Sequence, residues 1–164
     1  MSRILVIGIG NPLRGDDGLG RHAAERLSGR LRDPFIEVVA CHQLMPELAE
    51  QVARARMVIF LDACVGKKAG ALKLTRIAPT GKGRPSSFSH ELSPAELLAI
   101  AEALYGARPQ GVVLSITGES FGYSTELSAA VQRALPRLLR RAEQVAREAV
   151  PHFAKGGVRN HYRH

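Results

Sequence analysis

The feature that most constrains the fold is an apolar run, RILVIGI at residues 3–9, that leads directly into a glycine-rich turn, GNPLRGDDG. A continuous apolar run of this length is typical of a strand buried on both faces. A helical pattern follows, and its apolar residues recur on one stripe: Leu19, Ala23, Leu27 and Leu31. A buried strand, a turn and an amphipathic helix in this order predict the opening of an α/β domain.

The rest of the chain continues this alternation. Further strands are predicted at residues 35–40, 57–62 and 111–117, and the alternating segment 71–77 is typical of an edge strand. Helices are predicted at residues 46–55, 94–105 and 124–149. The second of these has Ser93 as N-cap, Glu96 in a capping-box position and Gly106 as its end, whereas Pro136 predicts a kink or a split in the last helix. Strands alternating with helices predict an α/β fold with a mainly parallel sheet.

Length and composition indicate one domain. The 164 residues, 45% of them hydrophobic, suffice for a single core, which we place at residues 1–152, followed by a basic, mobile tail at 153–164. Neither a run of 18 apolar residues nor a signal peptide is present, so we expect a cytoplasmic protein without membrane attachment. The two cysteines, Cys41 and Cys64, are then expected as reduced thiols.

The charge is concentrated in one part of the chain. The net charge is +8, and the segment from Arg133 to the end contains eight Lys/Arg against two acidic residues. The basicity therefore belongs to one helix and the tail. A solvated surface is the first interpretation, docking to an acidic protein the second and nucleic-acid binding the third, since no aromatic-interleaved basic motif accompanies the charge. We expect a monomer that binds no nucleic acid.

The turn after the first strand has a composition that argues against a dinucleotide site. The GxGxxG fingerprint requires glycines at positions 8, 10 and 13, but position 13 is a leucine. The pair Asp16–Asp17 stands where phosphates would bind, and two carboxylates repel a pyrophosphate and favour a cation. Two interpretations of the pair stay open: one carboxylate caps the following helix, and the other ligates a metal or acts as an acid or base.

Two further residues are candidates for the same site. Asp62 ends the apolar strand VIFLDA, and in the common doubly wound order strands one and three are neighbours, so Asp17 and Asp62 would face one crevice. Capping of the next turn is the alternative for Asp62. His90 precedes the Ser93 helix, where a lone histidine is usually just exposed. Together, two carboxylates and an imidazole suit a borderline divalent ion and leave coordination positions open.

With these motifs the chain resembles the hydrogenase maturation endopeptidases, over residues 3–150. The resemblance rests on the segment G-x-G-N-x-x-x-x-D-[DE]-x-x-G at Gly8–Gly20, supported by HQLMPEL at residues 42–48, the strand ending in Asp62, and His90 ahead of a helix. It implies a three-layer fold with a twisted, five-stranded sheet between helices. It also implies removal of a C-terminal extension from the large subunit of a nickel-iron hydrogenase after nickel insertion.

The resemblance further implies which residues act. Its catalytic and metal-contacting positions fall on Asp17, Asp62 and His90, with the second acid of the pair as the ligand and no organic cofactor. Some members carry an Asp-Gly-Gly-like stretch after the second strand. This chain has Cys41 and His42 there, so no catalytic carboxylate is carried over.

The mechanism stays open at this stage. The sequence contains neither a nucleophile elbow nor an HExxH helix, and the nucleophile is unassigned. Either the nickel held by the substrate is a recognition element, or a metal at the site activates water or polarises the scissile carbonyl. The competing classes are a metal-dependent hydrolase of another substrate, a nickel-sensing binding module and a nucleotide-binding protein.

Overall fold

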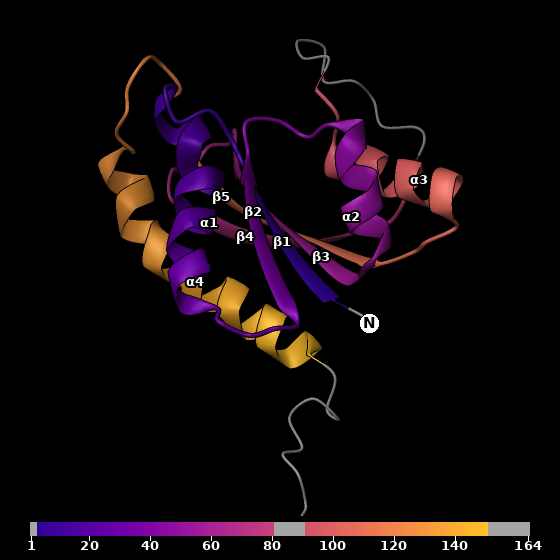
Figure 1. The fold of residues 1–164 in the computed structure, drawn as a ribbon. Coiled ribbons are helices and arrows are strands. Elements are labelled where there is room, and N and C mark those ends of the chain that lie inside the picture. The colour runs from indigo at the N-terminus through magenta and orange to yellow at the C-terminus, as the bar shows by residue number, and fades with distance from the viewer. Residues whose placement is uncertain (1–2, 81–90, 151–164) are drawn as a thin grey trace, which may run out of the picture.

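The computed structural model describes residues 3–80 and 91–150 as a sheet covered by helices (Figure 1). The sheet contains five strands: β1 (Arg3–Ile9), β2 (Ile36–Cys41), β3 (Ala55–Cys64), β4 (Leu72–Ile77) and β5 (Gln110–Thr117). The α-helices are α1 (Leu19–Arg30), α2 (Ala49–Ala53), α3 (Pro94–Tyr105) and α4 (Ala129–Ala149), and two 3₁₀ turns are η1 (Gly15–Gly18) and η2 (Pro46–Leu48). The predicted boundary at residue 152 and the predicted tail at 153–164 lie outside the described residues.

The strand order is β2-β1-β3-β5-β4. β1 pairs in parallel with β2 and β3, and β3 pairs in parallel with β5, whereas β4 is antiparallel to β5 and forms an edge. Helices α1 and α4 cover one face of the sheet, and α2 and α3 cover the other (Figure 1). The predicted three-layer α/β fold is confirmed, as are the edge strand at 71–77 and the adjacency of strands one and three.

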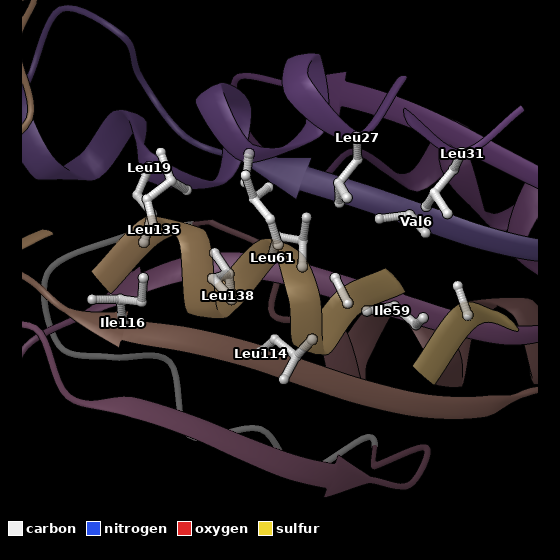
Figure 2. Close-up of a cluster of buried hydrophobic side chains, with 14 of the residues drawn as sticks. Val6, Leu19, Leu27, Leu31, Ile59, Leu61, Leu114, Ile116, Leu135 and Leu138 are labelled. Carbon is white, nitrogen blue, oxygen red and sulfur yellow. The ribbon is translucent and has the colours of Figure 1, made fainter. Parts of the chain in front are cut away.

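The two faces of β1 show why the first strand is continuously apolar. Ile4 and Val6 pack toward α1 and α4, while Leu5 and Ile7 pack toward α2 and α3. Figure 2 shows the first of these two cores, in which leucines of α1 and α4 meet the branched side chains of β1, β3 and β5. Each fully buried side chain of this size contributes about 1.5–3 kcal/mol.

The helices follow their local signals in most places. Ser93 accepts the backbone N–H of Glu96 at 3.1 Å, and Gly106 ends α3 in the left-handed region at φ 66°. The single helix predicted at 46–55 is instead the turn η2 followed by α2. The last helix begins at Ala129 rather than 124, with Ser128 as its cap.

Of the kink or split predicted at Pro136, the split does not occur. α4 continues through this residue for 21 residues in all. Pro136 is on the exposed side of the helix, and the opposite face is buried continuously in the core. Packing of that face holds the helix together across the missing N–H.

Two glycines of the first motif serve close packing of α1 on the sheet. A Cβ at Gly8 would lie 2.1 Å from the carbonyl oxygen of Gly20, and a Cβ at Gly20 would lie 2.1 Å from that of Leu61. The backbones of α1, β1 and β3 therefore approach as closely as glycine permits. In the part of the chain that the structure describes, no helix combines the length and apolarity needed to cross a bilayer.

Candidate active site at the carboxyl edge of the sheet

The acidic pair is divided between two environments. Asp16 is fully buried, and its carboxylate accepts four hydrogen bonds from the loop between β5 and α4. The donors are the backbone N–H of Glu119 (2.7 Å), Ser120 (3.0 Å) and Ser128 (2.7 Å), and the hydroxyl of Ser128 (2.8 Å). Asp16 thus ties η1 to the start of α4, a structural role.

Capping of the following helix, the first interpretation of the pair, is not what either aspartate does. The N-cap of α1 is Gly18, and no side chain bonds to it there. Burial by itself would raise the pKa of Asp16, but the three backbone N–H groups and the Ser128 hydroxyl outweigh it, so the pKa falls below its ordinary value. Asp16 is an ionised carboxylate whose hydrogen-bonding capacity the protein already uses.

Asp17 remains available at the edge of the sheet. Its side chain is partly exposed and accepts one hydrogen bond, from the backbone N–H of Asn11 at 3.0 Å. Gly10, at φ 153°, lies against the backbone of Asp17, because a Cβ there would be 1.8 Å from the carbonyl oxygen of Asp17. Only glycine lets the turn fold back over the end of β1 and present this carboxylate.

Asp62 reaches the same edge from β3. Leu61 is in register with Gly8, so Asp62 follows one residue later, beside the end of β1. Its Oδ1 accepts the N–H of Ala63 at 2.8 Å. Burial, as the largest cause, raises the pKa of Asp62 to about 7; the Ala63 N–H opposes this rise, and the negative charges of Asp17 and Glu91 add to it.

The structure therefore brings Asp17 and Asp62 together. η1 contacts β3, and the charge on one carboxylate affects the ionisation of the other. His90, the third predicted ligand, lies outside the described residues. Within residues 3–80 and 91–150 no three His, Cys, Asp or Glu side chains group so that they could hold a metal ion. Two carboxylates by themselves would offer a divalent ion only an incomplete shell of oxygen atoms.

Sequence reasoning missed two neighbours of this pair. Cys41 ends β2 beside Ile9, where burial and the charge of Asp62 raise the pKa of its thiol and Arg21 opposes the rise. The only signal was its position at the end of the strand next to β1. The second is the loop held by Asp16, whose residues have no periodicity and are 103 to 112 positions away in the sequence.

Four large apolar side chains are exposed on loops that follow the parallel strands. They form what we term the apolar rim: Leu13 (57% exposed), Met45 (44%), Val65 (87%) and Tyr123 (95%). Two of these loops are joined by backbone hydrogen bonds, Gly15 N–H to Ser124 oxygen at 2.8 Å and Ser124 N–H to Leu13 oxygen at 3.1 Å. Exposed apolar side chains gathered at one edge are typical of a surface that contacts a macromolecule.

Comparisons with known proteins bear on this arrangement. No family model matches the sequence. The hydrogenase 2 maturation protease of Escherichia coli (strain K12) is 28% identical over 165 residues, covering 93% of this chain and 98% of that protein. The structure of the hydrogenase maturating endopeptidase HybD from E. coli has a TM-score of 0.73 at 26% identity, covering 90% and 94% of the two chains.

A third likeness supports the fold. The [NiFe] hydrogenase maturation protease HycI from Thermococcus kodakarensis KOD1 also has a TM-score of 0.73, at 24% identity, covering 89% of this chain and 93% of that one. The shared sheet and the full-length likeness to proteases define the class of this protein: it is a peptidase with an α/β fold. More particularly, the chain is similar along nearly its whole length to hydrogenase maturation endopeptidases, the family that its motifs resemble.

Proposed function

We propose that this protein removes the C-terminal extension from the large-subunit precursor of a nickel-iron hydrogenase in the cytoplasm, after nickel has been inserted. The nickel is part of the substrate, and Asp17, Asp62 and His90 contact it as a recognition element. The observation that carries the proposal is the meeting of Asp17 and Asp62 at one edge of the sheet.

The chemistry of the two carboxylates supports a cation in this position. Burial is the largest cause of the raised pKa of Asp62, and the like charge of Asp17 adds to it by raising the free energy of the doubly ionised state. A divalent ion between them would reverse that penalty. Because the pair offers few ligands, it would complete the shell of an ion already held by the precursor, and the apolar rim would contact the protein around it.

The experiment is a cleavage assay with chelator-treated protein and a large-subunit precursor, followed by intact mass. Nickel-loaded precursor should lose its extension, whereas nickel-free precursor should not. Asp17→Asn should weaken this discrimination. Asp33→Asn is the matched control, because Asp33 also accepts one local N–H (from Phe35, 2.8 Å) but follows α1, before β2.

Each competing outcome points to a different protein. Equal cleavage of loaded and empty precursor would remove nickel recognition from the mechanism. Activity that is lost on chelation and restored by zinc would indicate a metallopeptidase. Binding of loaded precursor with no change in its mass would indicate a nickel-sensing module.

A further inference from the structure

A second charged surface, which shares no residue with the carboxylate pair, lies between β4 and α4. Two hollows occur there, one of about 460 Å³ and one of about 210 Å³. Six cationic side chains line them, and we call these six the basic strip: Arg56, Arg76 and Arg141 in the larger hollow, and Lys68, Arg133 and Arg137 in the smaller. Glu148 is the one acidic residue among the described lining residues of the two hollows.

The charges of the strip are not neutralised by neighbours. Among the described residues, none of the six cations forms an ion pair. Arg137 donates to the carbonyl oxygen of Gly70 at 3.4 Å, and Arg141 donates to Gln144 at 2.9 Å. Glu148 accepts a hydrogen bond from that same Gln144.

The spacing along α4 carries a stability cost. Arg133, Arg137 and Arg141 follow one another at intervals of four, so they are neighbours on one side of the helix. Each like-charged pair at this spacing destabilises a helix. Elsewhere the same helix does pair its charges: Glu143 lies 3.6 Å from Arg30 of α1. A row of unpaired positive charges beside two hollows indicates a negatively charged ligand.

The shape of the surface favours an extended ligand. The smaller hollow lies beside residues 68–71, just before β4, and the larger lies beside Leu74 and Ile77 near its end. A strand rise of about 3.3 Å per residue separates the two regions by roughly 20 Å. Apolar side chains such as Met57 and Val145 also line the larger hollow. Within the described residues β4 pairs with β5 alone, which leaves its other backbone edge open to a further strand.

We propose that the basic strip is a docking surface for an extended acidic segment of a partner protein, one in which acidic and apolar residues alternate. Alternation places the acidic residues on one side of an extended chain and the apolar residues on the other. Nucleic acid fits less well, because no aromatic side chain is among the described residues that line either hollow, and unpaired bases bind chiefly by stacking on such rings. The inference does not depend on the proposed peptidase substrate.

The test uses the full chain and fluorescence anisotropy with a labelled peptide of four alternating Glu-Leu repeats. Two double variants remove charge from the strip: Arg76→Gln with Arg141→Gln, and Arg133→Gln with Arg137→Gln. Each should weaken binding about tenfold, as expected for the loss of two surface ion pairs. The matched control double variant changes Arg26 and Arg32 to glutamine; both are exposed and lie outside the strip.

The control pair should change the dissociation constant less than about twofold, and no variant should have a lower melting temperature than the unmodified protein. A peptide of the same composition with its glutamates in one block should bind more weakly than the alternating one. Equal weakening by the control pair would refute a defined site, and equal affinity for the block peptide would refute the extended geometry. A single-stranded oligothymidylate that binds more tightly, with the same dependence on the strip, would show a nucleic-acid surface instead.

Discussion

Neighbouring aspartates should give opposite phenotypes when each is changed to asparagine. Asp16→Asn replaces one carboxylate oxygen, which accepts hydrogen bonds, by an NH2 group that can only donate them. Oδ2 accepts three hydrogen bonds and Oδ1 only that of the Ser128 N–H, so the amide nitrogen should occupy the Oδ1 position. The Ser128 N–H then loses its acceptor, and the three remaining bonds lose their charge.

The magnitude follows from these contacts. An unsatisfied buried donor costs about 1–3 kcal/mol, and the charged form of a hydrogen bond contributes about 1 kcal/mol more than the neutral form. Asp16→Asn should therefore lower the free energy of unfolding by about 4–6 kcal/mol, a large part of the stability of a domain this size. Asp17→Asn should lower it by less than about 1 kcal/mol, because its one bond, to the Asn11 N–H, can be kept by the amide oxygen.

Urea denaturation at pH 7 measures both values, and the precursor cleavage assay measures the functional effect of Asp17→Asn. Ser128→Ala should fall between them, at about 1–2 kcal/mol, because it removes the hydroxyl that donates to Asp16 and caps α4. The reasoning fails if Asp16→Asn costs less than about 1 kcal/mol, or if Asp17→Asn destabilises the protein as much as Asp16→Asn does.

Three further predictions concern the edge and the core. Replacing Leu13 and Tyr123 of the apolar rim by alanine should raise the KM for precursor by roughly tenfold with little change in kcat. Alanine at Leu104 and Tyr105, another exposed Leu–Tyr pair at the end of α3, should change neither, and equal effects of the two pairs in the cleavage assay would refute docking at the rim. Gly20→Ala should lower the free energy of unfolding by at least about 3 kcal/mol in urea denaturation, since its Cβ would lie 2.1 Å from a β3 carbonyl oxygen; a loss below about 1 kcal/mol would contradict the close approach. Because the pKa of Asp62 is about 7, the folded protein binds one proton more than the unfolded chain between about pH 4 and 7, so the stability contributed by this group falls as pH rises through that range. Asp62→Asn should remove this fall. A series of urea titrations at different pH values would measure it, and an unchanged slope of stability against pH would contradict the prediction.

The fold was predictable because its determinants are local. Strand and helix periods identified β1, α1 and β5, and cap residues fixed both ends of α3. The adjacency of strands one and three then placed Asp17 and Asp62 at one edge, because parallel strands end at the same edge.

The role of Asp16 was not predictable in this way. Its partners are more than a hundred positions away, in a loop without periodicity. The family motif selects Asp17 as the ligand, but nothing near Asp16 in the sequence indicates what Asp16 binds. The start of α4 was missed for the same reason. The segment 124–128 contains helix-compatible residues, but Ser128 is held at the cap position by Asp16, a contact made only in the folded chain.

The division of the acidic pair explains how a loop can be both rigid and reactive. Asp16 accepts all its hydrogen bonds from the chain itself, and this fixes η1 and the loop before α4 on each other. Asp17 is thereby presented beside Asp62 without the loss of conformational entropy that an unrestrained loop would suffer on binding. On the proposed function, a cation brought by the precursor meets two carboxylates, of which Asp62 is half protonated near neutral pH. Its binding would release the proton of Asp62, so affinity for nickel-loaded precursor should rise with pH between 6 and 8, opposite in sign to the effect of Asp62 on stability.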